Sequence, residues 1–192
     1  MDASRVGVGP ALSLITAELD SMVDRLVIGG SDGLDALADL LAEAPRVFVL
    51  GAGRSGLALR MTAMRLMHLG LEVHVVGEVT ASAIAAGDVL LTASGSGTTG
   101  GIVRAAQTAV GVGARVAAIT TAADSPLADL ATVRILVPAA GKLDRSGSAS
   151  AQYAGSLFEQ AVVLLGDALF HGLWQRSGVT ADELWPRHAN LE

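Results

Sequence analysis

Hydroxyl and glycine residues gather at two points of the chain where a hydrophobic strand is followed by a helix. The first is Gly51-Ala-Gly-Arg-Ser-Gly56, directly after the apolar run Val47–Leu50, and the second is Ser94-Gly-Ser-Gly-Thr-Thr99, after Asp88–Ala93. A helix N-terminus has unpaired N–H donors and a partial positive charge, and glycines let a ligand approach the backbone closely. We therefore expect these segments to bind an anion such as a phosphate.

The first segment also matches the dinucleotide-binding pattern Gly51-x-Gly53-x-x-Gly56, which would make the protein a NAD-dependent oxidoreductase. Glu78 lies near the place where an acidic residue binds the ribose in such sites. The second hydroxyl-rich loop argues against this interpretation. A dinucleotide site does not need a second loop of hydroxyl and glycine residues at a helix N-terminus. A site that binds a sugar phosphate between the ends of two strands does.

Composition excludes several classes of function. The chain has 192 residues, a net charge of -6 and 3% aromatic residues, which disfavours binding to nucleic acid. The absence of cysteine excludes disulfides, thiolate metal sites and thiol catalysis. It suits a reducing cytoplasm, as does the lack of a signal-peptide pattern. No spacing puts two of the four histidines on one helical face, so no metal site is expected.

Strands and helices alternate between residues 47 and 137. The alternation predicts right-handed crossovers and a flavodoxin-like, three-layer αβα sandwich with five parallel strands in the order 2-1-3-4-5. Ligands then bind beyond the carboxyl ends of strands one and three. The predicted strands are Val47–Leu50, Leu71–Val76, Asp88–Ala93, Arg115–Thr120 and Val133–Val137, and the predicted helices between them are Ser55–Leu69, a helix ending near Val112, and Ser125–Leu130.

Helical segments precede and follow this α/β unit. Two helices, Pro10–Ile28 and Asp32–Ala44, form an N-terminal arm over residues 1–44, and residues 45–192 form the core of the same single domain. The loop 141–150 is a candidate lid over the site. The long helix Gln152–Arg176 is apolar around most of its surface, which predicts subunit contacts and a homo-oligomer.

Six segments, which span most of the chain from Val47 to its C-terminus, are together specific for one family. The chain resembles the sugar isomerase (SIS) domain family and, within it, the 6-phospho-3-hexuloisomerases. It departs from that group at Ala154, where methionine is usual, and at Thr99-Gly-Gly101, where a serine often follows. The matching segments are Gly51-Ala-Gly-Arg-Ser-Gly56, Ala63-Met-Arg-Leu-Met-His-Leu-Gly70, Val76-Gly-Glu78, Ser94-Gly-Ser-Gly97, Gly155-Ser-Leu-Phe-Glu-Gln160 and Arg187-His-Ala-Asn-Leu-Glu192.

The resemblance implies that the enzyme interconverts D-arabino-3-hexulose 6-phosphate and fructose 6-phosphate. It also implies a tetramer and a place beside hexulose-phosphate synthase in formaldehyde fixation through ribulose monophosphate. It makes Glu159 the catalytic base. Moving a carbonyl from C3 to C2 takes a proton from C2 and returns one to C3 through an enediol(ate), which one carboxylate can do without a metal or redox cofactor.

The resemblance also implies roles for other side chains. Arg54 and its neighbour Gly53 are possible substrate contacts, as is Glu78, and Arg54 pairs with either the phosphate or a neighbouring subunit. His68 and His188 are expected to line the pocket, where either can polarise the migrating carbonyl or carry a hydroxyl proton. If the C-terminal tail crosses to another subunit, the active site is shared. The residues expected to bind the phosphate are Ser55, Ser94, Gly95, Ser96, Gly97 and Thr99.

A non-catalytic sugar-phosphate regulator is the alternative to an isomerase. Such a protein would use both hydroxyl loops but would not need Glu159, so replacing this residue distinguishes the two.

Overall fold

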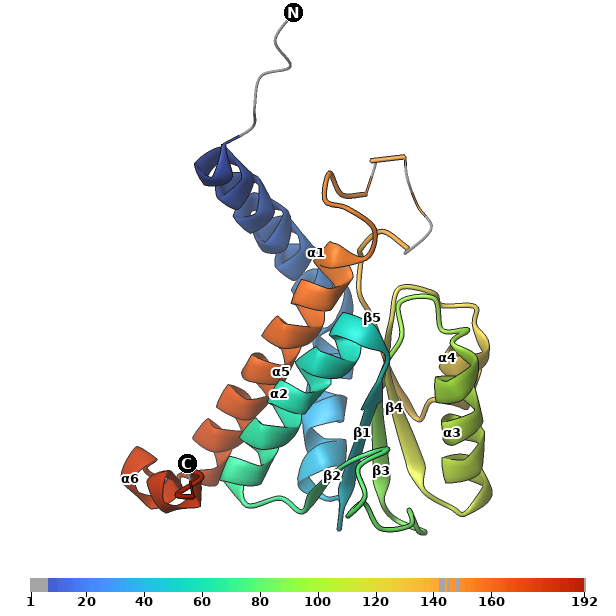
Figure 1. Ribbon diagram of the computed structural model, residues 1–192, viewed down its shortest axis with the longest axis vertical. Coiled ribbons are helices and arrows are strands. Elements are labelled where there is room, and N and C mark those ends of the chain that lie inside the picture. The colour runs from blue at the N-terminus through green and yellow to red at the C-terminus, as the bar shows by residue number, and fades with distance from the viewer. Residues whose placement is uncertain (1–6, 142–143, 145, 148, 192) are drawn as a thin grey trace, which may run out of the picture.

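The computed structural model describes residues 7–141, 144, 146–147 and 149–191, and for Ser31 the backbone alone. Five strands form one all-parallel sheet in the order β2-β1-β3-β4-β5 (Figure 1). This order and the α/β class confirm the prediction from the sequence. The strands are β1 (Val47–Gly51), β2 (Val73–Val75), β3 (Val89–Ala93), β4 (Arg115–Thr120) and β5 (Val133–Leu136).

Helices cover both faces of the sheet, because its central strands are apolar on both sides. The helices α1 (Val8–Ala42), α2 (Gly53–Leu69) and α5 (Ser156–Ser177) lie on one face. The helices α3 (Gly100–Gly111) and α4 (Pro126–Leu130) lie on the other (Figure 1). A short helix, α6 (Ala181–Leu184), and the 3-10 turn η1 (Trp185–Arg187) follow α5.

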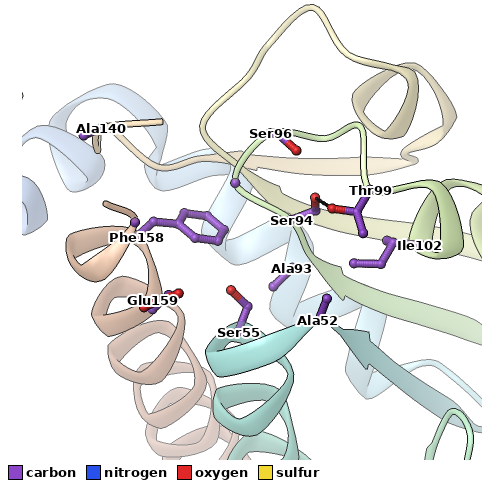
Figure 2. Close-up of a pocket in the computed structure, with 12 residues that line it drawn as sticks. Ala52, Ser55, Ala93, Ser94, Ser96, Thr99, Ile102, Ala140, Phe158 and Glu159 are labelled. Carbon is purple, nitrogen blue, oxygen red and sulfur yellow. Dashed lines mark hydrogen bonds between the residues drawn. The ribbon is translucent and has the colours of Figure 1, made fainter. Parts of the chain in front are cut away.

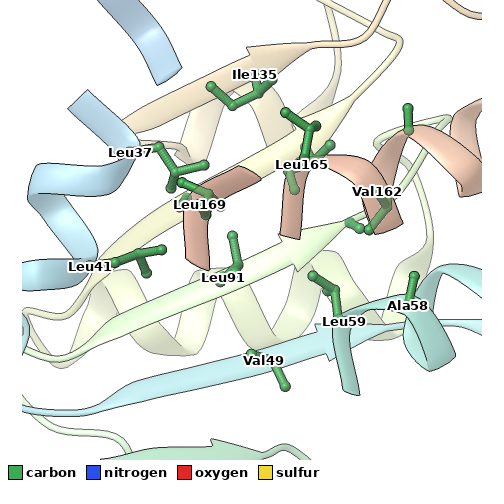
Figure 3. Packing of buried hydrophobic residues seen from close by; sticks show 14 of the residues in the cluster. Leu37, Leu41, Val49, Ala58, Leu59, Leu91, Ile135, Val162, Leu165 and Leu169 are labelled. Carbon is green, nitrogen blue, oxygen red and sulfur yellow. The ribbon is translucent and has the colours of Figure 1, made fainter. Parts of the chain in front are cut away.

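The larger part of the hydrophobic core lies between the sheet and the face formed by α1, α2 and α5 (Figure 3). Leu37 and Leu41 of α1 are fully buried there. α2 and α5 also approach each other closely, because a Cβ on Gly166 of α5 would collide with the Thr62 hydroxyl oxygen of α2. This contact fixes the distance between the two helices whose N-terminal ends face the carboxyl edge of the sheet.

The N-terminal arm consists of two helical segments, as predicted, which meet at a kink. They follow one another without an intervening loop and together make up the 35 residues of α1, but Gly30 between them has non-helical backbone angles, with a φ of -156°. The break therefore lies at the predicted Gly29-Gly30, although neither glycine takes the left-handed conformation that ends many helices. The second segment of α1 packs on the core together with Met22 and Leu26 of the first segment, whose N-terminal part rises away from the sheet (Figure 1).

The two edges of the sheet are short. β2 has three residues, and the chain reaches β3 from it through a loop rather than a helix. This loop is fixed by Asp88, which binds the guanidinium of Arg46 at 2.6 Å and accepts the N–H of Ala85 at 2.7 Å. At the other edge, α1 runs beside β5, so that a Cβ on Gly33 would lie 3.6 Å from the Ile135 side chain.

Within the part of the chain that the structure describes, no helix combines the length and the hydropathy needed to cross a membrane.

Candidate functional site

The glycine turn after β1 brings the start of α2 against the end of the strand. A Cβ on Gly56 would lie 2.5 Å from the carbonyl oxygen of Gly51, so only glycine allows this approach. Gly53 has a φ of +56°, which glycine adopts without strain. As a result Ser55 lies in the first turn of α2 and is buried at the carboxyl edge of the sheet.

The loop after β3 is held in shape by contacts between its backbone and residues at and after the end of β4. The carbonyl of Gly95 accepts hydrogen bonds from the hydroxyls of Thr120 and Thr121, at 3.1 and 2.8 Å. Gly97 has a φ of +63°, and a Cβ there would collide with the Ser125 hydroxyl. The loop therefore needs no rearrangement to present its hydroxyl groups.

A cavity of about 100 Å³ lies between this loop and the starts of α2 and α5 (Figure 2). The N-termini of α2 and α3 both reach it, and neither has a side-chain cap. Their first N–H groups are thus free to donate to a ligand, which is the arrangement that binds phosphate at helix N-termini. On one wall the hydroxyls of Ser94 and Thr99 are 3.0 Å apart.

Glu159 supplies a carboxylate on the opposite wall. It lies in the first turn of α5 and faces Ser55 of α2 across the cavity (Figure 2). Its Oε2 is 3.2 Å from Nε of Arg54, and a quarter of its side chain is exposed to solvent. A carboxylate held beside an anion-binding cradle is suited to moving a proton on a phosphorylated substrate.

The structure brings together most of the residues predicted to form the site. Arg54 reaches the edge of the cavity through its ion pair with Glu159, while Gly53 and Gly97 shape the two turns. The predicted residues that line the cavity are Ser55, Ser94, Gly95, Ser96, Thr99 and Glu159.

Glu78 lies in a different place. Its carboxylate pairs with Arg60 at 3.1 Å, and it lines a second cavity together with Phe48 and Ala105, on the face covered by α3. The prediction that Glu78 contacts the same substrate is therefore not supported within this chain, because its strand β2 ends on the far side of β1.

His68 and His188 do not line the cavity of their own chain, so the prediction that they line a pocket now depends on a neighbouring copy. Ser55 and His68 are 13 residues apart on α2, or about 20 Å along the helix axis. The two histidine rings stack on each other at 4.0 Å, and Arg187 donates to the carbonyl of His68 at 2.8 Å. The C-terminal tail is therefore docked on the opposite end of α2 from the site (Figure 1).

The surroundings of His68 favour its neutral form. Burial lowers the pKa of its imidazole, and the nearby His188 and Arg65 lower it further. Its Nδ1 is buried and has no hydrogen-bond partner among the described residues.

Two features of the site were missed in the sequence. Phe158 lines the cavity and packs against Gly95, and its position next to Glu159 was the available signal. The ion pair between Arg54 and Glu159 joins residues 105 positions apart, so no pattern of neighbouring residues in the sequence could predict it. The predicted lid, 141–150, falls partly outside the described residues, and none of its described residues lines the cavity, although Ala140 just before it does.

Comparisons with known proteins find relatives of similar length and fold. A family model described as SIS domain matches residues 40–163. A 3-hexulose-6-phosphate isomerase of Mycobacterium gastri is 54% identical, over 90% of this chain and 87% of its own, and one of Bacillus subtilis is 38% identical, over 82% and 86%. A crystal structure of a Methanococcus jannaschii protein, from which a 3-hexulose-6-phosphate isomerase function was inferred, superposes with a TM-score of 0.80 at 27% identity, covering 95% of this chain and 99% of that one.

Proposed function

The chain belongs to the SIS-domain family, and from this premise we propose that it is a 3-hexulose-6-phosphate isomerase. It interconverts D-arabino-3-hexulose 6-phosphate and fructose 6-phosphate. The observation that carries the proposal is that Glu159 shares one small cavity with the hydroxyl loop and the N-termini of α2 and α3. This cavity offers both an anion cradle and a base.

The phosphate binds at the loop between β3 and α3. The hydroxyls of Ser94 and Thr99 and the backbone N–H groups around Gly95 donate to its oxygens, and Ser55 donates from the start of α2. The protein has a net charge of -6, so the phosphate is recognised by these local donors rather than by a long-range field.

Glu159 then carries out the proton transfer. Its carboxylate takes a proton from C2 of the open-chain ketose, the electron pair forms the enediol(ate), and the same carboxyl returns a proton to C3. Arg54 holds the carboxylate in place through the 3.2 Å ion pair.

The migrating carbonyl also needs a proton donor, for which His68 and His188 are the candidates. Since they lie at the far end of α2, they act on the cavity of a neighbouring copy in a homo-oligomer, which we take to be a tetramer. The reaction stands beside hexulose-phosphate synthase, which supplies the substrate in formaldehyde fixation through ribulose monophosphate.

The first test is a coupled assay of fructose 6-phosphate formation from hexulose 6-phosphate. We expect Glu159→Gln to lower kcat by ~10²–10⁴-fold, because the amide cannot accept the C2 proton, while fructose 6-phosphate still binds. Glu43→Gln, which changes a largely exposed carboxylate at the end of α1, is the control and should leave kcat unchanged.

Other outcomes favour the alternatives. Sugar-phosphate binding with no turnover by the unmodified protein would favour the regulator. Turnover that requires a nicotinamide cofactor and is lost in Glu78→Gln would favour the oxidoreductase. Full activity in Glu159→Gln would show that Glu159 is not the base that transfers the proton.

A further inference from the structure

A carboxylate of the N-terminal helix is bound to the segment that leads into α5. Glu18 of α1 accepts three hydrogen bonds from residues more than 130 positions away. They come from the hydroxyl of Ser150 at 2.6 Å, the N–H of Ala151 at 2.7 Å and the side-chain amide of Gln152 at 3.0 Å. Ser150 in turn accepts the backbone N–H of Gln152 at 3.0 Å. One side chain thus holds three consecutive residues.

The same network continues into the first turns of α5. The side-chain oxygen of Gln152 accepts a hydrogen bond from the amide of Gln160 at 2.9 Å. Gln160 follows Glu159 directly, and the other amide atom of Gln160, its Oε1, is buried without a partner among the described residues. A chain of hydrogen bonds therefore connects α1 to the residue next to the proposed base.

Packing closes only part of this junction. Leu157 at the start of α5 is buried in the core cluster that includes Met22 of α1. A surface groove of about 530 Å³ nevertheless runs between α1 and the start of α5, and Glu18 and Arg25 are among the residues that line it. Ala154, between the anchored segment and α5, has a φ of +51°, a left-handed conformation that costs an alanine about 1 kcal/mol. Such a conformation persists only when its surroundings determine it.

We propose that Glu18 is a positioning residue for Glu159: by fixing Ser150–Gln152, and Gln160 through Gln152, it sets the place of the first turn of α5 relative to the phosphate loop. This inference rests on the proposed function for its kinetic part. Glu18 itself does not line the cavity, so it acts through other residues and not on the sugar.

Glu18 is suited to this role because it remains an acceptor. Burial raises the pKa of its carboxyl group, but the hydrogen bonds from Ser150, Ala151 and Gln152 together lower the pKa below its usual value. At neutral pH all three donors therefore meet an ionised carboxylate.

The test is Glu18→Gln, which keeps the shape of the side chain but turns an amide NH₂ toward donors. We expect kcat for hexulose 6-phosphate to fall by about 10- to 100-fold, because a displacement of the Glu159 carboxylate by about 1 Å costs a rate factor of this size. KM should stay within about twofold of its original value. KM is kept because the loop Ser94–Thr99 has no contact with Glu18 in the described network. The matched control is Asp20→Asn, an exposed carboxylate two residues further along α1, which should change neither constant.

Two further measurements separate this inference from a general loss of stability and from the proposed function. Amide hydrogen exchange of residues 151–160 should accelerate in Glu18→Gln, while residues 94–102 exchange as before. Gln152→Met should lower kcat in the same way, and the double variant should lose less than the product of the two effects. Unchanged exchange and kcat in Glu18→Gln, or a raised KM with unchanged kcat, would overturn the inference. If exchange accelerates but the unmodified protein has no isomerase activity, the anchoring stands and the proposed function fails.

Discussion

Ser94 and Glu159 reach one cavity from opposite walls, and their different chemistry predicts different kinetic effects. A hydroxyl that binds the phosphate contacts the same oxygens before and during the reaction, so its loss weakens substrate and transition state alike. A base changes its protonation only as the reaction proceeds. The two side chains should therefore affect KM and kcat separately.

Ser94→Ala should raise KM by roughly fivefold, which corresponds to about 1 kcal/mol for one lost hydrogen bond, and leave kcat within about twofold. Steady-state kinetics with hexulose 6-phosphate measure both constants. Ser13→Ala on the exposed face of α1 serves as the control. A lowered kcat at unchanged KM would mean that Ser94 takes part in the chemistry rather than in phosphate binding.

Among single residues, the sequence predicted the site residues that directly follow a strand. It missed the residues whose role depends on partners far away in the sequence. Ser55 and Ser94 were found because parallel strands all end at one edge of the sheet. For His68 the sequence did show that a helix starting at the site carries its last turn about 20 Å away, so its prediction as a pocket residue depends on a neighbouring copy. Glu18 was missed because its partners lie more than 130 residues further along the chain.

Among the elements, α2 and α5 together decide the geometry of the site. Each begins at the cavity, with Ser55 on one and Glu159 on the other, and Arg54 joins them there. Lower down, the absence of a side chain at Gly166 lets α5 lie against Thr62. The contact between Gly166 and Thr62 therefore fixes the distance between the two helices, and this distance determines how far apart Ser55 and Glu159 lie in the cavity.

Gly166→Ala should destabilise the protein by about 1–2 kcal/mol, because the strain of overpacking against Thr62 exceeds the gain of an alanine in a helix. Urea unfolding measures the change. Thr62→Ala should relieve the clash, so that Gly166→Ala costs less in that background. Gly172→Ala is the matched control in α5, because a Cβ there meets nothing within 4 Å, and it should be neutral or stabilising. Equal stability of Gly166→Ala and Gly172→Ala would contradict this account.

Among the elements, the prediction was nearly complete for the sheet and also located the break in the N-terminal arm. The alternation of apolar strands and amphipathic helices determined the order of the strands, and β4 matches its predicted range, Arg115–Thr120, in full. Gly29 and Gly30 were interpreted as the end of the first helix, and the chain does leave helical geometry at Gly30. Met22 and Leu37, on either side of this kink, are both buried in the core, so the two segments pack on it together.

For the whole molecule, the exposed hydrophobic residues and the position of the tail point to association of copies. α2 exposes Leu57, Met61 and Met64 on one face, and α1 exposes Leu12 and Val27. The spacing of Leu57, Met61 and Met64 places them on one helical face, and exposed apolar faces of this kind commonly mark protein interfaces. They support the proposal that the histidines of one copy complete the cavity of another.

A mixture of Glu159→Gln and His188→Ala protomers tests whether sites are shared. Each variant alone should have little activity, whereas co-expressed in equal amounts they should regain about a quarter of the unmodified activity if two copies share each site. This recovery arises because half of the pairs are hybrids, and each hybrid contains one intact site. Activity no greater than that of the two parents would show that His188 serves its own chain or has no catalytic role.

The margins of the sheet have a consequence for how copies can meet. β2 offers only three residues of open backbone, and α1 lies along β5 at the other margin. Neither side provides a long template onto which a foreign strand could add, so fibril-like growth by strand addition is disfavoured. The homo-oligomer proposed above is therefore expected to form through contacts between helices, in which side chains rather than backbone groups determine which surfaces bind.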